Sequence, residues 1–296
     1  PEMSRGLGDV YKRQGENTKT PKLLSIILYA LSCTCKGKFG KIKKKRREPQ
    51  EKTQRKGEWL MYYIGIDLGT SAVKLLLMQG DGQIANIVSR EYPIAFPHPG
   101  WSEQNPADWW DAVCAGIPEL LNGFDASQVA GIGAGGQMHG LVMLDAENQP
   151  IRKSIIWCDQ RTAKEVAEIT DKVGADRMIE ITANPAITGF TAAKIMWVKN
   201  NEPQNYEKCR HILLPKDYIR FMLTGEFATE VSDASGMQLL DIPNRCWSDE
   251  VLNKLGIDKA LLAKVYESPE ITGTITAKAA ELTGLKVGTP VVGGAG

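Results

Sequence analysis

An aspartate at the end of an apolar run is the first residue that could carry chemistry. Asp67 lies in "GIDLGTSAVK" (65–74), where a glycine, Thr70 and Ser71 follow as in a tight turn. A carboxylate beside turn amides and hydroxyls suits a phosphate with bound Mg²⁺, and Lys74 would add positive charge. The alternative is an ordinary hairpin turn, because the stretch lacks the GxxxxGK[ST] spacing of a P-loop.

A glycine-rich stretch, "GIGAGGQMHGLVMLD" at 131–145, is the second candidate. Its glycines allow close backbone approach, and Gln137, Met138 and His139 then offer an amide, a thioether and an imidazole. These groups suit recognition of a polyol through hydrogen bonds. The dinucleotide-binding pattern GxGxxG does not fit, because we expect a hairpin and not a helix to follow. A purely structural histidine is the alternative.

Two other aspartates lie near predicted element ends, and three tryptophans form a further group. We expect Asp159, in "WCDQR", to cap a helix, whereas Asp233, in "VSDASG", either caps a helix or lines a cleft. We expect Trp101, Trp109 and Trp110 to pack in the core and not to stack on a sugar.

The elements that must position these residues indicate an α/β fold. Three strands, "YYIGIDLG", "AVKLLLMQ" and "QIANIVSREY", predict an antiparallel meander. Asn105-Pro106 then predicts a helix to about Leu121, as an N-cap followed by a proline in the first turn. We expect "VAGIGAGGQ" to form a strand, "GLVMLDAENQPI" a hairpin, and "HILL" and "TPVV" short strands. Further helices are expected near 161–173, 191–200, 215–223, 249–255 and 277–283.

The charge is divided unevenly along the 296 residues, although the formal net charge is only +1. Residues 1–60 hold 16 Lys and Arg against 6 Asp and Glu, which leaves 20 against 29 for the remainder. The acidic remainder gives no basic surface for a nucleic acid. Six cysteines show neither metal-ligand nor disulfide spacing. We therefore expect a cytoplasmic enzyme with no nucleic-acid or membrane partner.

The first 60 residues are expected to be a non-native or disordered prefix. Residues 1–14 resemble a translated sequencing adapter, and the apolar run at 22–32 is too short to span a bilayer. The basic stretch at 36–56 follows that run, whereas a secretory signal places its basic residues before it. A signal segment or a nucleic-acid tail are the alternatives, and we expect the natural start at Met61.

Seven stretches together resemble the FGGY carbohydrate kinase family, and within it the xylulokinases. In order they are "YIGIDLGTSAVK", "PHPGWSEQNPADWW", "GGQMHG", "IIWCDQRT", "LLPKDYIRFMLTGEF", "SDASG" and "SPEITGTI". The resemblance implies that 61–296 is a ribonuclease-H-like domain of the actin and hexokinase type. It would be the first of two domains, with the C-terminal domain absent and with ATP and sugar meeting in the cleft between the two.

The resemblance also assigns roles to the residues on the nucleotide side. Asp67 matches an aspartate that lies beside the metal and the phosphates and is important for activity. Thr70 and Ser71 match the turn that binds the ATP phosphates, and Lys74 lies on the strand that leaves this turn. ATP and Mg²⁺ are therefore the expected cofactors.

On the sugar side, Met138 and His139 match the pair that contacts the ketose, with Gln137 beside them. The catalytic base of the family is an aspartate in a "GGGDN" segment after the strand written here as "TPVV". This chain has "GGAG" there, so the base is expected just after Gly296.

The resemblance implies ATP-dependent phosphorylation of D-xylulose to D-xylulose 5-phosphate, a step of pentose catabolism. The chain would be an N-terminal fragment that is inactive alone, and a homodimer is one expectation for the full-length enzyme. Two alternatives stay open. One is another specificity within the family, such as gluconokinase or ribulokinase, and the other is a non-catalytic sugar-binding domain.

Overall fold

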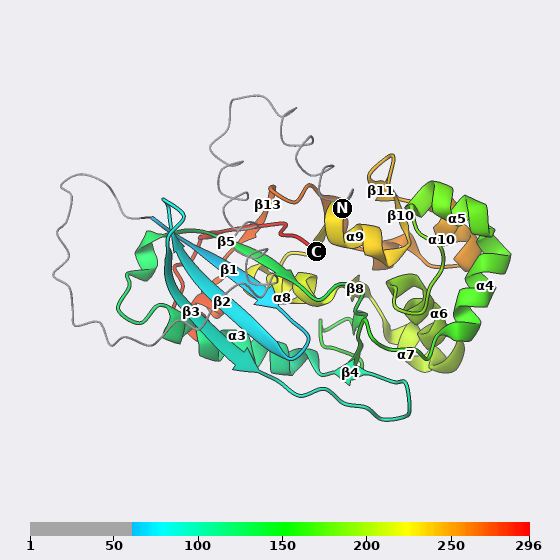
Figure 1. Ribbon diagram of the computed structural model, residues 1–296, viewed down its shortest axis with the longest axis horizontal. Coiled ribbons are helices and arrows are strands. Elements are labelled where there is room, and N and C mark those ends of the chain that lie inside the picture. Colours follow the sequence, from blue (N-terminus) through cyan, green and yellow to red (C-terminus); the bar gives the residue numbers. More distant parts are fainter. Residues whose placement is uncertain (1–60) are drawn as a thin grey trace.

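A six-stranded mixed sheet organises one end of the molecule (Figure 1). The computed structural model describes residues 61–296, so the expectations for the prefix at 1–60 lie outside it. The strand order is β13-β14-β5-β1-β2-β3, in which β1, β5 and β14 run parallel and the other neighbours are antiparallel. The bounds are β1 Tyr62–Leu68, β2 Ala72–Gln79, β3 Ile84–Glu91, β5 Val129–Gly136, β13 Ile271–Thr274 and β14 Pro290–Val292.

The predicted meander is confirmed as β1, β2 and β3. Ile64, Ile66 and Leu68 alternate along β1 and are completely buried, as a strand with one face on a core requires. Asp67 lies between them in sequence and so faces the opposite side of the sheet. The register places it directly across from Lys74 of β2.

Helix α3 (Pro106–Leu120) packs on the core face of this sheet. It begins as the sequence predicts, because the Asn105 side chain accepts a hydrogen bond from the Ala107 amide and a proline occupies the first turn. Two further helices, α8 (Pro215–Thr224) and α11 (Ala277–Thr283), pack beside it. The buried apolar side chains of α3 include Trp109, Val113, Ile117 and Leu120.

Helices dominate the other end of the molecule and surround a second apolar core (Figure 1). They are α4 (Ala163–Val173), α5 (Ala175–Thr182), α6 (Thr191–Asn201), α7 (Pro203–Lys208) and α10 (Asp249–Leu255). All five helices expected after residue 160 are present, whereas α5, α7 and the short α9 (Val231–Ala234) were not predicted. Across residues 61–296, no helix combines the length and apolar character needed to cross a membrane.

The hairpin expected at 140–151 forms only in part. The chain turns back at 145–149, where the Ile151 amide donates to the Met143 carbonyl oxygen at 2.9 Å. Strand β6 (Val142–Leu144), however, pairs along its length with β8 (His211–Leu213). The other short strands are β4 (Glu103–Gln104) with β7 (Ser154–Ile155), β9 (Ala228–Glu230) with β12 (Lys264–Tyr266), and β10 (Leu240–Asp241) with β11 (Cys246–Trp247). The 3₁₀ turns are η1 Ala126–Gln128, η2 Ser235–Met237 and η3 Lys259–Leu261.

Candidate functional site

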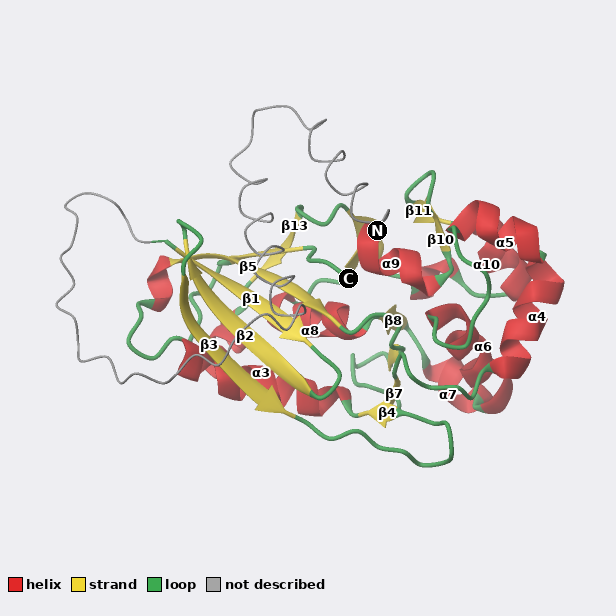
Figure 2. Cartoon of the chain, viewed as in Figure 1, coloured by secondary structure: helices red, strands yellow, loops and turns green. Residues whose placement is uncertain are grey.

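The carboxyl ends of three parallel strands meet at one edge of the sheet, and Figure 2 shows β1 and β5 pointing the same way. Asp67 of β1 is in register with Gly135 of β5, and Gly135 forms a parallel bridge with Ala295 beyond β14. Open α/β sheets bind ligands outside the carboxyl ends of their strands. This edge is therefore the candidate site.

The turn between β1 and β2 carries the predicted phosphate residues. Asp67 is half-buried just before the turn, Thr70 is half-buried within it, and Ser71 is exposed. Lys74 is exposed on β2 opposite Asp67, on the same face of the sheet. The structure thus brings together the four residues that the sequence singled out on this side.

Tyr92 holds this turn through two hydrogen bonds. Its hydroxyl donates to the Gly69 carbonyl oxygen, and its amide donates to the Ser71 carbonyl oxygen at 3.2 Å. Burial, together with the negative charge of Asp67, raises the pKa of the Tyr92 hydroxyl well above its ordinary value. The phenol therefore stays protonated and keeps donating to the turn.

Two side chains missed by the sequence analysis fix Thr70. The Trp157 indole Nε1 donates to Thr70 Oγ1 at 2.9 Å, although the indole is 46% exposed. Gln104 Nε2 donates to the Thr70 carbonyl oxygen at 2.7 Å, and Gln104 Oε1 accepts from Gln137 Nε2 at 2.8 Å. Gln104 and Gln137 therefore link the Asp67 turn to the glycine-rich stretch. No local signal marks either contact, because each joins residues at least 33 apart in sequence.

Gln137 is held by hydrogen bonds that leave its side-chain oxygen unused. Its backbone amide donates to the Leu68 carbonyl oxygen at 2.7 Å. Gln104 Nε2 donates to two carbonyl oxygens, which fixes Gln104 Oε1 as an acceptor and Gln137 Nε2 as its donor. Gln137 Oε1 is then buried and accepts no hydrogen bond from any group within 61–296. A buried acceptor of this kind suits a ligand hydroxyl.

Glycines permit the close approach of the strand ends. A Cβ on Gly136 would lie 2.6 Å from the Leu68 carbonyl oxygen, which no side chain allows. Gly294 has φ +98°, and a Cβ there would lie 1.9 Å from the Ala134 carbonyl oxygen. Larger residues at these two positions would force β1, β5 and the segment after β14 apart.

His139 presents one nitrogen as an acceptor. Its Nδ1 lies 3.0 Å from the Gly236 carbonyl oxygen, so Nδ1 carries the proton and Nε2 of the neutral ring is the acceptor. Burial and the charge of Lys194 lower the pKa of His139 to about 4, against a smaller opposing effect of the Gly236 bond. The ring is therefore neutral at pH 7. It packs on Phe190 with centroids 4.1 Å apart, and the neighbouring Met138 is 42% exposed.

Asp159 does not cap a helix, so that expectation is wrong. The N-cap of α4 is Thr162, and the buried Asp159 carboxylate accepts instead from the Ser102 amide at 2.7 Å. Arg161 binds the same carboxylate through Nε and a terminal nitrogen, at 2.9 and 2.7 Å. The Arg161 guanidinium lies 3.7 Å from the ring centroid of Trp101. This group fixes the loop that carries Trp101, while Trp109 and Trp110 pack in the core as expected.

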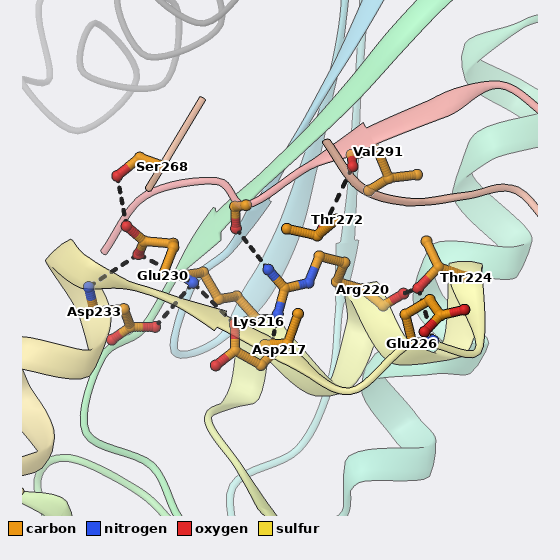
Figure 3. Close-up of polar contacts among 12 residues, drawn as sticks. Lys216, Asp217, Arg220, Thr224, Glu226, Glu230, Asp233, Ser268, Thr272 and Val291 are labelled. Carbon is orange, nitrogen blue, oxygen red and sulfur yellow. Dashed lines mark hydrogen bonds and ion pairs between the residues drawn. The ribbon is translucent and has the colours of Figure 1, made fainter. Parts of the chain in front are cut away.

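Asp233 belongs to a buried charge cluster beneath the last residues of the chain (Figure 3). Lys216 Nζ lies 3.0 Å from Asp217, 3.2 Å from Glu230 and 3.5 Å from Asp233. The N-cap of α9 is Glu230 and the Asp233 side chain is completely buried, so within residues 61–296 Asp233 neither caps a helix nor lines an open cleft.

The cluster also holds the glycine segment at 293–296. Arg220 donates to the Gly293 carbonyl oxygen at 3.1 Å. The Gly296 amide donates to Ser232 Oγ at 3.0 Å, and that hydroxyl donates in turn to Glu230. The segment is thereby fixed beside the end of β5.

The residues present fit a magnesium ion that is shared with a phosphate. Within 61–296 no group of three His, Cys, Asp or Glu side chains is arranged to hold a metal. Mg²⁺ commonly takes only one or two protein carboxylates and completes its shell with water and substrate phosphates. Asp67, beside the Thr70 turn, meets that requirement.

The chain has relatives that match it along its described part. The N-terminal domain of the FGGY family of carbohydrate kinases matches residues 62–296. The xylulose kinase of Bacillus subtilis is 41% identical over 237 residues, which are 79% of this chain and 47% of that protein. The chain thus spans about half the length of the curated relatives it matches.

Solved structures give the same result. The xylulose kinase from Rhodospirillum rubrum superposes with a TM-score of 0.76 at 30% identity, over 79% of this chain and 48% of that one. The gluconate kinase from Lactobacillus acidophilus has a TM-score of 0.76 at 28% identity, over 80% and 48%. These matches confirm the expected sugar-kinase fold of the actin and hexokinase type. The chain belongs to the FGGY family of carbohydrate kinases and contains its N-terminal domain.

Proposed function

We propose that this chain is the N-terminal half of an enzyme that transfers the terminal phosphoryl group of ATP to D-xylulose. The product is D-xylulose 5-phosphate. The observation that carries the proposal is the hydrogen-bonded link, through Gln104 and Gln137, between the Asp67 turn and the His139 loop. A phosphate-binding group and a hydroxyl-binding group then share one sheet edge. The similarity to xylulose kinases supports the choice of sugar.

The sugar site uses acceptors that the fold leaves for hydroxyl groups. Gln137 Oε1 and His139 Nε2 accept from sugar hydroxyls, and the neutral imidazole adds no charge to a neutral substrate. Met138 gives an apolar contact to the carbon skeleton beside them.

The nucleotide site is the turn after β1. Asp67 holds Mg²⁺, which neutralises phosphate charge when bound. Thr70, Ser71 and the turn amides donate to phosphate oxygens, and Lys74 adds positive charge. Phosphoryl transfer depends mainly on such positioning and charge neutralisation. The 293–296 segment is held beside β5 at the same sheet edge, through the Gly135–Ala295 bridge and the bond from the Gly296 amide to Ser232.

Sugar binding by this chain is the first test. The His139 ring signals are followed by NMR while D-xylulose, D-ribulose or D-gluconate is added. We expect D-xylulose to shift them at the lowest concentration, and Gln137→Leu to weaken that binding about tenfold for one lost hydrogen bond in a buried site. Gln149→Leu, in an exposed turn, is the control and should bind as the parent does. No response to any of the sugars would contradict the assignment of the site.

Catalysis is tested on a gene extended to the full length of the relatives. We expect D-xylulose-dependent ADP release, and a loss of about 10²-fold or more in kcat for Asp67→Asn, which removes a charge from the phosphate site. The chain alone should not turn over, because it spans about half of the active relatives. Sugar binding without ADP release by the extended protein would favour a non-catalytic sugar-binding domain.

A gluconokinase specificity is the second candidate. The superposition on a gluconate kinase is as close as that on a xylulose kinase, at similar identity. Gluconate carries a carboxylate, and the neutral His139 and the Gln137 amide supply no positive charge for it. We therefore favour the neutral ketose, and tighter binding of D-gluconate would reverse this choice. The homodimer, the cytoplasmic location and the division at residue 61 stay predictions.

A further inference from the structure

A buried lysine lies behind His139. Lys194 of α6 is completely buried, and its Nζ donates to the His139 carbonyl oxygen and to the Gly189 carbonyl oxygen, both at 2.6 Å. The two carbonyl groups belong to segments 50 residues apart. One ammonium group therefore fixes the distance between the His139 loop and the start of α6.

The His139 backbone needs such support because its φ is +64°. A non-glycine residue in this left-handed region costs on the order of 1–3 kcal/mol unless its surroundings hold it there. The Thr191 hydroxyl donates to the same carbonyl oxygen at 3.2 Å. Lys194 and Thr191, both on α6, thus occupy both acceptor positions of this oxygen and oppose rotation of the peptide group.

The backbone conformation in turn sets the direction of the imidazole ring. With the peptide group held, Nδ1 reaches the Gly236 carbonyl oxygen and the ring packs on Phe190. Phe190 follows Gly189, whose carbonyl oxygen accepts from the same Lys194. The lysine therefore holds both the histidine and the aromatic ring against which it packs, which leaves Nε2 as the acceptor on the remaining side.

The chemistry of Lys194 fits a positioning role better than simple packing. Burial lowers its pKa to about 7, although Asp159 and Cys158 oppose this effect. Burying an amine in this way is costly, and an apolar side chain of similar length would fill the space without that cost. The ammonium and the neutral amine both have at least two N–H groups, so either form keeps both carbonyl bonds.

We propose that Lys194 is a positioning residue of the sugar site, which holds His139 in its left-handed conformation so that Nε2 meets the ligand. The sugar as ligand rests on the proposed function, whereas the effect of Lys194 on the His139 ring does not.

A lysine on the same helix supplies a matched control. Lys199 Nζ also donates to two backbone carbonyl oxygens, of Leu255 at 3.1 Å and of Gly256 at 2.6 Å. These carbonyl groups lie at the end of α10, which packs against α4. Lys199→Met should lose comparable hydrogen bonds and leave the site intact, so it separates positioning from general stability.

The experiment compares Lys194→Met, Thr191→Val and Lys199→Met by NMR of the His139 ring nitrogens and by D-xylulose titration. In the parent we expect one tautomer, with the proton on Nδ1. In Lys194→Met we expect a mixture of both tautomers and sugar affinity reduced about tenfold or more, the cost of a displaced hydrogen-bonding group. Thr191→Val removes one donor and no charge, so a smaller change in the same direction isolates positioning from electrostatics. Lys199→Met should match the parent in both measurements.

An unchanged tautomer in Lys194→Met and Thr191→Val would overturn the proposal. So would equal effects of Lys194→Met and Lys199→Met. If Lys194→Met does not fold, the tautomer measured in Thr191→Val decides whether the proposal holds. If the parent binds no sugar, the proposed function fails, while the tautomer measurement still tests the role of Lys194.

Discussion

Asp233 is the one carboxylate of its cluster that receives no hydrogen bond from the described residues. Three carboxylates there face two cations, Lys216 and Arg220. Asp217 accepts from both cations, and Glu230 accepts from two hydroxyls and two backbone amides. Burial raises the pKa of Asp233 to about 7 against the opposing effect of Lys216, and the neighbouring carboxylates act in the same direction as burial. Asp233 therefore holds the proton that balances the cluster.

The pKa of Lys216 is consistent with this assignment. Burial alone would lower it, but the carboxylates raise it above its ordinary value. Asp217 and Glu230 are both nearer to Nζ than Asp233 is. The ammonium thus keeps its charge through these two partners and does not require an ionised Asp233.

The raised pKa of Asp233 predicts how stability depends on pH. Its ordinary value is 3.8 and its value in the fold is about 7, so the folded chain binds this proton more tightly than the unfolded chain. The resulting stabilisation is complete below pH 4 and is lost as the pH rises through 7. Between pH 5 and pH 8 the loss amounts to roughly 2–3 kcal/mol, at 1.36 kcal/mol for each pKa unit. Asp233→Asn keeps the shape and lacks this titration.

Urea unfolding at pH 5 and pH 8 measures the effect. We expect the parent to lose roughly 2–3 kcal/mol of unfolding free energy relative to Asp233→Asn when the pH rises from 5 to 8. Asp171→Asn, on the exposed face of α4, is the control and should change stability by less than about 0.5 kcal/mol at both pH values.

A loss of stability in Asp233→Asn relative to the parent, when the pH rises from 5 to 8, would refute this reasoning. If Asp233 were the ionised partner of Lys216, its removal would break a buried ion pair and cost about 3–5 kcal/mol. That deficit would be larger at pH 8 than at pH 5. A constant difference across both pH values would equally exclude a titrating Asp233.

Three other outcomes are expected. In Gly236→Ala the new Cβ would lie 2.4 Å from His139 Nδ1 while the backbone of residue 236 accepts alanine, so the ring is displaced and sugar affinity in the NMR titration should fall about tenfold. Asn105→Ala removes the cap of α3 and should cost about 1 kcal/mol in urea unfolding with unchanged sugar binding. Because the pKa of His139 is lowered to about 4, sugar affinity measured by calorimetry should stay constant from pH 8 to pH 5 and fall below pH 4, where Nε2 becomes protonated.

The sequence predicts well those elements whose signals are local. The meander follows from the apolar runs of β1 and β2, and α3 follows from Asn105-Pro106. The pairing of β6 with β8 could not be predicted in this way, because the partner strand lies more than 60 residues away. The helices α5, α7 and α9 have only 8, 6 and 4 residues, and helices this short are not stable on their own sequence alone.

The residues of the candidate site also divide into those that a local sequence signal predicts and those that it does not. Asp67 and His139 stand in glycine-rich stretches that mark strand ends, so their position was predictable. Trp157 and Gln104 act only through contacts between distant segments. Asp159 has the sequence context of a helix cap, but Arg161 binds its carboxylate in the folded chain. Local context therefore finds candidate residues, whereas their partners decide what each one does.

At two places in this site, a buried cation donates hydrogen bonds to carbonyl oxygens of an irregular segment. The segments that follow β5 and β14 are irregular, so strand pairing does not satisfy all their carbonyl groups, and water does not reach those that are buried. Lys194 of α6 donates to the carbonyl oxygens of His139 and Gly189, and Arg220 of α8 donates to those of Gly293 and Ala228.

Both cations are completely buried, Arg220 on α8, which packs against β5, and Lys194 on α6, which packs against α4 and α7. A long side chain from a rigid helix reaches an irregular backbone without requiring that backbone to become a strand. The segments can thus keep the sharp, glycine-dependent path that presents Gln137 and His139 to a ligand. Burying the two charges costs free energy, and in return the irregular backbone of the site is held rigid.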